Sequence, residues 1–306
     1  MYKRQAYACN DRILAVGGQD GRIFLLDIDP DSDSFNRFIG ETAALAGPIL
    51  DLATAPDGLS VFAVCELDQD LYRFNVNPGS ASFGGQLGFQ ALGALEPQFL
   101  AVSPEGGRVL VGDPLDDMVH LVDWEAGAST PVPVTGSPAR AAYHPEGRLA
   151  FVVTPGLVIV LDADPASSNY GTPLESLAVP DFPNDLAFSP DGNLCYVLTG
   201  PPGGVADRTL VTLDCSNPLA LMEIGALALP ATGEAMQENL ALSPAGDRAL
   251  LNLRSDGLVL VDLSDGGLTV QGDLVPDDDP LGFAFSTDGA RCLLYTSDAA
   301  DDLQPV

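Results

Sequence analysis

Basic residues are scarce in this chain of 306 residues. Lysine and arginine number 13 against 43 aspartates and glutamates, so the formal net charge is −30, and Lys3 is the only lysine. Contacts with phosphate groups need cationic side chains, so this balance argues against binding of DNA, RNA or an anionic membrane. The acidity is consistent with a strongly hydrated surface, or alternatively with a bound cation or a basic partner.

Long apolar runs and catalytic signatures are also missing. No run of about 18 apolar residues occurs, so we expect no membrane insertion. The patterns G-x-S-x-G, H-E-x-x-H, G-x-G-x-x-G and the P-loop are all absent, and His120 and His144 are the only histidines. Both histidines fall within repeated segments, so we expect structural roles for them. Neither a Ser-His-Asp triad nor a multi-histidine metal centre is therefore expected.

Cysteine is used sparingly. The chain has five cysteines, with no C-x-x-C pair and no spacing typical of metal ligands. We expect Cys9, Cys65, Cys195 and Cys215 to be free thiols that are buried or partly buried. This usage fits a cytoplasmic protein and equally a periplasmic or secreted one.

A short phrase with the chemistry of a tight turn is present six times. It reads APDG at 55–58, SPEG at 103–106, HPEG at 144–147, SPDG at 189–192, SPAG at 243–246 and STDG at 286–289. Proline fixes φ and glycine frees it, which favours a tight turn at each copy. Successive turn glycines lie 41 to 54 residues apart. A repeat of this length with a turn in every copy predicts a β-propeller.

Each copy divides into four segments that are typical of strands. A first short run ends at the turn, a second apolar run follows it, and a third run ends in aspartate or, once, in Asn75. These runs are short, rich in Val, Leu, Phe and Ile, and bounded by Gly, Pro and Asp, which favours strands over helices. A looser fourth segment completes the copy. We therefore predict an all-β fold, a β-propeller of about seven four-stranded blades with the first and last blades incomplete.

Both ends of the chain resemble translated adapter DNA. Residues 292–301 read CLLYTSDAAD, which a transposon end with its adapter would encode, and residues 1–5 read MYKRQ, which the other strand of the same transposon end would encode. We therefore expect 1–5 and 292–306 to be adapter-derived, and 6–291 to form a single propeller domain. On this interpretation the natural termini, and any signal peptide or flanking domain, lie beyond this sequence.

The start of the first strand of each copy is where a ligand site is expected. Seven and eight residues before the turn glycine the residue type varies between copies, whereas the strand behind it is constant, and in a propeller these positions face the central funnel. The polar residues there are Asp51, Gln98, Arg140, Asn184, Asp185, Glu238 and Asn239. They are our candidate ligand-binding residues, and the alternative is that they only hydrate the mouth of the channel. Asp and Asn oxygens would suit calcium as a bound ion.

Two acidic loops are further candidates for a calcium site. Residues 27–33 read DIDPDSD, with acids at alternate positions as in an EF-hand loop, but Ser32 stands where that loop has glycine and Phe38 where it has glutamate. Residues 277–279 read DDD. We expect both segments to be hydrated turns.

Two segments resemble the YVTN-type repeat of lactonase-like propellers, a family similar in shape to the WD-repeat proteins. They are FPNDLAFSPDGNLCYVLTG at 182–200 and FLAVSPEGGRVLVGD at 99–113. The phrase PNDLAFSPDG is also similar to the PNGLAFSPDG of gluconolactonase and regucalcin propellers. That resemblance implies a metal-ligand role for Asn184, although Asp185 replaces the glycine of the phrase and those enzymes have six blades.

Two functions remain open from the sequence. The first is a non-enzymatic binding scaffold that presents its loops or funnel to a protein, glycan or small ligand. We expect it to be monomeric and part of a bacterial secreted, periplasmic or cell-surface protein, with the loop at 200–208 as one contact surface. The alternative is a lactone hydrolase in which a metal near Asn184, Asp51 and Glu238 polarises the carbonyl and activates water.

Overall fold

The computed structural model describes residues 5–8, 12–200, 208–229, 239–252, 258–264, 268–274, 280–286, 289 and 292–296. Within them the regular elements are strands, β1 to β26. No helix in this part of the chain could cross a membrane. The strands belong to two compact units, 1–137 and 138–306.

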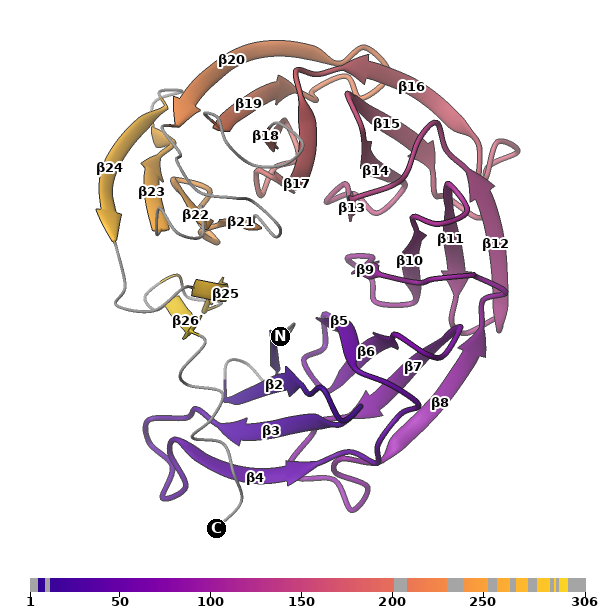
Figure 1. Cartoon of the computed structure of the whole chain (residues 1–306), viewed down its shortest axis with the longest axis vertical. Helices are drawn as coiled ribbons and strands as arrows, with labels where there is room; N and C mark the ends of the chain where they lie inside the picture. The colour runs from indigo at the N-terminus through magenta and orange to yellow at the C-terminus, as the bar shows by residue number, and fades with distance from the viewer. Residues whose placement is uncertain are drawn as a thin grey trace. The chain divides into compact units, whose positions relative to one another are not determined.

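Unit 1 consists of three four-stranded sheets. The first contains β1 (Gln5–Ala8), β2 (Ile13–Gly17), β3 (Ile23–Asp27) and β4 (Arg37–Glu41). The second contains β5 (Ile49–Thr54), β6 (Ser60–Cys65), β7 (Asp70–Asn75) and β8 (Gln86–Ala91). The third contains β9 (Phe99–Val102), β10 (Arg108–Asp113), β11 (Met118–Asp123) and β12 (Ala128–Pro133). In this unit the first strands β5 and β9 lie toward one side and the fourth strands β4, β8 and β12 toward the other (Figure 1).

Unit 2 contains three further four-stranded sheets and a two-stranded one. The first contains β13 (Arg140–Tyr143), β14 (Leu149–Thr154), β15 (Leu157–Asp162) and β16 (Pro173–Ala178). The second contains β17 (Phe182–Phe188), β18 (Leu194–Gly200), β19 (Arg208–Asp214) and β20 (Met222–Leu229). The third contains β21 (Asn239–Leu242), β22 (Arg248–Asn252), β23 (Leu258–Asp262) and β24 (Thr269–Leu274). The last pairs β25 (Pro280–Phe285) with β26 (Cys292–Thr296).

Each four-stranded sheet is an antiparallel meander in chain order, as the repeat predicts for a propeller blade. The described residues form six such blades and one two-stranded sheet, where we expected about seven blades with both ends incomplete. The expectation for the first blade is wrong, because β1 supplies its first strand and pairs Ala6 with Ala15. Sequence reasoning missed β1 because no proline–acid–glycine turn separates it from β2. The adapter origin of 1–5 and 292–306, and a single domain over 6–291, stay predictions.

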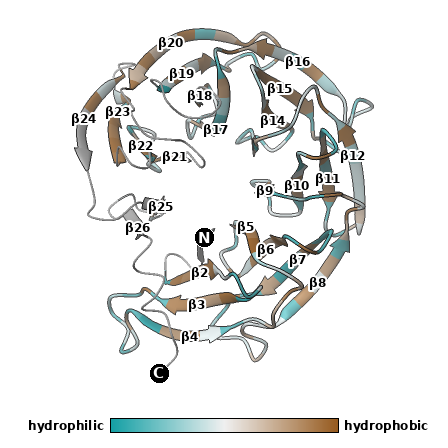
Figure 2. Cartoon of the chain, in the orientation of Figure 1, coloured by the Kyte–Doolittle hydropathy of each residue, from teal (hydrophilic) through white to brown (hydrophobic). Residues whose placement is uncertain are grey.

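Burial follows strand order within a blade. All six residues of β6 are buried, whereas the fourth strand of the first blade, β4, is exposed or half-buried throughout. A second strand has hydrogen-bonded neighbours on both edges and packed blades on both faces, so it is a continuous apolar run instead of an alternating one. Figure 2 shows the hydrophobic colour along middle strands such as β3, β15 and β23.

The repeated turn joins neighbouring blades. Its glycine has a positive φ in every copy, between 67° and 79°. A Cβ on Gly106 would lie 2.9 Å from Cδ of Pro56 in the preceding turn, and one on Gly246 would lie 2.5 Å from Cδ of Pro190. Glycine is therefore required at this position for two reasons: the backbone is left-handed, and the proline of the preceding turn leaves no space for a Cβ.

Gly106 and its neighbour Gly107 offer a matched test of this contact. Gly106→Ala should lower the free energy of unfolding by about 1–3 kcal/mol, because a Cβ is strained at positive φ and meets Pro56. Gly107→Ala has open space around its Cβ and should be neutral or stabilise by up to about 1 kcal/mol. Urea denaturation of the two variants measures the difference, and equal effects would contradict the turn-stacking account.

Candidate functional site

Two of the candidate funnel residues hold neighbouring blades together. Oδ2 of Asp51, in β5, accepts a hydrogen bond from the backbone N–H of Leu100 in β9 at 3.0 Å. Oδ2 of Asp185, in β17, accepts one from Leu240 in β21 at 2.9 Å. In each case Oδ1 accepts the N–H of the next residue in the chain. The two carboxylates thus play the same part in the two units: each ties the first strand of one blade to the first strand of the next.

The other candidate funnel residues have varied surroundings. Gln98 is exposed and donates to Oε1 of Glu96 at 3.1 Å. Arg140 is half-buried at the start of β13. Asn184 is the extra residue of a β-bulge, where the register of β17 against β18 shifts between its two neighbours. Asn239 is the first residue of β21, and Glu238 lies outside the described residues.

The structure brings only some of these residues near one another. Asp51 bonds the strand that directly follows Gln98, so both belong to one edge of unit 1. Asn184 and Asp185 adjoin in unit 2, where Asp185 bonds the strand that begins at Asn239. The loop 201–207 and the acidic run 277–279 lie outside the described residues.

We expect the bridging aspartates to matter for stability. Asp51→Ala and Asp185→Ala each leave a buried backbone N–H without its acceptor, which should cost about 1–3 kcal/mol of unfolding free energy. Gln98→Ala, at an exposed position of the same set, should change stability by less than about 0.5 kcal/mol. Chemical denaturation tests this, and an unchanged stability in both aspartate variants would contradict the bridging role.

His144 has the structural role that the sequence suggested. It stands where the other copies of the turn have serine or alanine, and its ring approaches the next turn, with Nε2 3.1 Å from the carbonyl oxygen of Gly192. The N–H of Glu146 donates to Nδ1, so Nε2 is the ring nitrogen that carries the proton and donates to Gly192. The imidazole thus joins the turns of two successive blades.

His120 is a different case. It is 3% exposed in β11, and among the described atoms neither ring nitrogen has a hydrogen-bond partner. The nearest acid is Asp113, 1% exposed, whose Oδ2 lies 4.0 Å from Nε2 and itself accepts the backbone N–H of Leu95. Burial lowers the pKa of His120 from its ordinary value, while the charges of Asp113 and Asp116 oppose that change.

This lowered pKa makes stability depend on pH. In the unfolded chain His120 binds a proton below its ordinary pKa of about 6.5, whereas the folded protein holds it neutral to lower pH. Acidification from pH 7 to pH 5 should therefore destabilise the protein. His120→Leu should flatten that dependence, which melting curves across the range would show. Parallel curves for the variant and the parent protein would contradict this account.

The acid that ends the third strand organises the loop to the fourth strand. In the first blade, Oδ2 of Asp27 accepts the hydroxyls of Ser32 and Ser34 at 2.6 and 2.5 Å, and Oδ1 accepts the N–H of Asp29 at 2.9 Å. These hydrogen bonds, those from the two serines first, lower the pKa of Asp27. The segment 27–33 is therefore an internally bonded loop around Asp27, and its residues Asp31 and Asp33 are exposed, as expected for a hydrated turn.

The same loop occurs in two further blades. It is a second repeated motif, and the sequence analysis did not identify it. Asn75 bonds the hydroxyls of Ser80 and Ser82, and Asp162 accepts that of Ser167. Nine residues after each of these three residues, Asp27, Asn75 and Asp162, comes a left-handed residue whose N–H donates to the carbonyl of that Asp or Asn. These left-handed residues are Asn36, Gly84 and Gly171. The signal that could have found it is the shared pattern of DIDPDSDSFN, NVNPGSASFG and DADPASSNYG.

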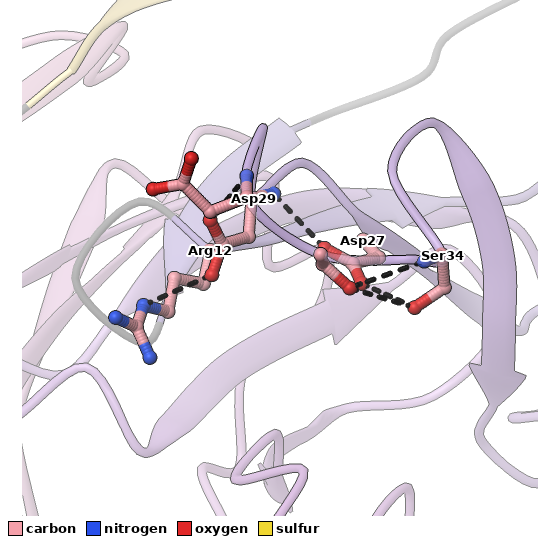
Figure 3. A network of polar contacts seen from close by, with 6 residues as sticks. Arg12, Asp27, Asp29 and Ser34 are labelled. Carbon is pink, nitrogen blue, oxygen red and sulfur yellow. Dashed lines mark hydrogen bonds and ion pairs between the residues drawn. The ribbon is translucent and has the colours of Figure 1, made fainter.

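A cavity of about 420 Å³ lies beside the Asp27 loop, between the first and second blades of unit 1. Its polar wall is formed by Arg12, Asp27, Asp29, Ser32 and Ser34, and its apolar part by Ile13, Ile39, Pro78 and Phe83. Nε of Arg12 lies 3.3 Å from Oδ2 of Asp29. Figure 3 shows the two terminal nitrogens of Arg12 on the side away from Asp29, and Ser34 bonded to Asp27. The cavity thus combines donors and acceptors with an apolar floor.

The thiols agree with the sequence expectation as far as they are described. Cys65, Cys195 and Cys215 are free and buried, while Cys9 lies outside the described residues. Burial raises the pKa of the Cys65 and Cys195 thiols. Such thiols are poor nucleophiles at neutral pH, so they are unsuited to covalent catalysis.

Comparison with known proteins assigns the fold. No known protein family matches the sequence, and no curated protein matches it. Among solved structures, Kuenenia stuttgartiensis hydrazine synthase is similar with a TM-score of 0.68 and 16% sequence identity, over 82% of this chain and 74% of that one. This likeness shows an all-β protein with a β-propeller fold. With 1626 matching chains of solved structure, the fold alone points to no particular activity.

Proposed function

We propose that this propeller is a non-enzymatic binding scaffold, part of a bacterial secreted, periplasmic or cell-surface protein. The observation that carries the proposal is the cavity between the first two blades of unit 1, whose volume is within the range of small-ligand sites. The funnel carboxylates support the same conclusion, since Asp51 and Asp185 already accept backbone hydrogen bonds with both oxygens.

The lining of the cavity favours a neutral polyhydroxylated ligand such as a glycan. Arg12 and Asp29 form an ion pair, so an anion finds no unopposed positive charge in the cavity. Both oxygens of Asp27 already accept hydrogen bonds from its own loop, which occupies part of their capacity to bind a cation. The terminal nitrogens of Arg12 and the oxygens of Asp29 can still donate to and accept from hydroxyl groups. Phe83 and Pro78 offer an apolar surface to the face of a sugar ring.

Binding of neutral oligosaccharides tests the proposal. Maltotriose, cellotriose and chitotriose, titrated calorimetrically, should include at least one ligand whose affinity falls about tenfold or more in Phe83→Ala and in Arg12→Ala, equivalent to about 1.4 kcal/mol. Arg148→Ala is the matched control, because Arg148 and Asp164 repeat the Arg12–Asp29 pair in unit 2 with a 4.0 Å separation. Equal losses in all three variants, or no binding by any sugar, would contradict the cavity as the site.

The lactone hydrolase is the alternative, with calcium as its proposed ion. It is supported by the resemblance around Asn184 and by the bulge at that residue, since bulges are over-represented beside active sites. Melting curves with added calcium and an assay of lactone hydrolysis distinguish it from the scaffold. A calcium-dependent rise in melting temperature together with turnover of a sugar lactone would favour the hydrolase over the scaffold.

A further inference from the structure

Three exposed leucines lie at one end of unit 1. Leu67 is 71% exposed, Leu95 53% and Leu115 65%. Leu67 and Leu115 are in the hairpins between the second and third strands of their blades, and Leu95 is in the connection from β8 to β9. In an antiparallel meander these loops lie at the same end of the sheets, opposite the repeated turns and the cavity.

Hydrogen bonds join these three loops to one another. The N–H of Leu92 donates to the carbonyl of Gln69 at 3.3 Å, which joins the connection to the first hairpin. The N–H of Leu95 donates to Oδ2 of Asp113 at 2.6 Å, which joins it to the second hairpin. We call the exposed residues of 66–69, 93–98 and 114–117 the hairpin face.

The hairpin face carries acids without bases. Each leucine adjoins at least one acid in the chain: Glu66 and Asp68, Glu96, and Asp116. The segments 65–70, 92–98 and 113–118 contain no lysine or arginine. Burial and the nearby charge of Asp68 raise the pKa of Asp70, so neighbouring carboxylates here act on one another.

Three arginine–acid contacts lie at the opposite end of unit 1. There Arg12 pairs with Asp29, Arg108 with Glu105, and Arg73 lies 3.9 Å from Glu125. The hairpin end also has one arginine, Arg22 in the β2–β3 hairpin of the first blade, which pairs with Asp20 and Glu41. The acids of the hairpin face, in the second and third blades, have no arginine within their own loops. Exposed leucines that adjoin carboxylates in loops without a basic residue are complementary to an apolar partner of the opposite sign.

We propose that the hairpin face binds a basic protein segment that inserts apolar side chains among Leu67, Leu95 and Leu115. A second copy of this chain is disfavoured, because both surfaces would carry the same negative charge. Nucleic acid is disfavoured for the same reason. The inference rests on the scaffold function proposed above but uses a surface separate from the cavity. The carboxylates steer the partner and the leucines supply contact area, so association should slow as salt rises.

The experiment measures binding of a synthetic amphipathic peptide of lysine and leucine to the full chain, with a glutamate and leucine peptide as the negative probe. Leu67→Ser with Leu115→Ser should weaken binding about fivefold or more. Leu59→Ser with Leu219→Ser, at positions 44% and 53% exposed outside the hairpin face, should leave it within about twofold.

A second pair of variants separates this site from general charge attraction. Glu66→Gln with Asp116→Asn removes two charges from the hairpin face, and Asp31→Asn with Asp33→Asn removes two from the opposite end. A larger loss for the first pair supports the proposal, whereas equal losses in the two pairs, or no binding of the basic peptide, overturn it. Neither outcome alters the cavity, so oligosaccharide titration of the same variants still tests the scaffold function independently.

Discussion

The contact between successive turns is the constraint on which the rest of this structure depends. A glycine with positive φ lies against the proline, or in one copy His144, of the preceding turn, and leaves no room for a side chain. This fixes the spacing of neighbouring blades at one end within each unit. The bridging carboxylates Asp51 and Asp185 fix it again along the first strands, through hydrogen bonds to backbone N–H groups that would otherwise be unpaired. With both positions set, the loops at the other end are free to vary, which is where binding surfaces on a rigid scaffold arise.

The sequence predicted those parts of the fold that depend on local chemistry. The six turns, the continuous apolar second strands and the polar end of each third strand all lie where the pattern indicated, because each depends on residues a few positions apart. The strand β1 was missed because QAYA has too few residues and no turn signal to mark it. The roles of Asp51 and Asp185 could not be predicted, since each carboxylate finds its partner about fifty residues further along the chain.

The candidate site was predicted less well than the fold, for a physical reason. Variation along a constant strand marks positions that are free to differ, but it does not distinguish a ligand-binding group from one that bonds the next blade. Phe99 illustrates the point: it occupies the same repeat position as Asp51 and Asp185, yet it is 1% exposed and packs into the core. The cavity involves residues from two blades, Arg12 and Phe83 among them, and neither belongs to the turn phrase.

The acidic residues of the chain fall into groups that differ in what their carboxylates bind. The carboxylate of Asp27 accepts two serine hydroxyls and a backbone N–H, so its charge is satisfied within its own loop and its pKa is lowered. The carboxylate of Asp51 accepts hydrogen bonds from backbone N–H groups of two neighbouring blades. Carboxylates such as Glu66 and Asp116 lie in exposed loops that lack any basic residue. Only this last kind contributes a field that an approaching molecule meets undiminished, because charges satisfied by fixed internal donors are partly offset before solvent is reached. The net charge therefore overstates the attraction for cations in general, and the exposed acids of the hairpin face are among those that contribute to it most directly.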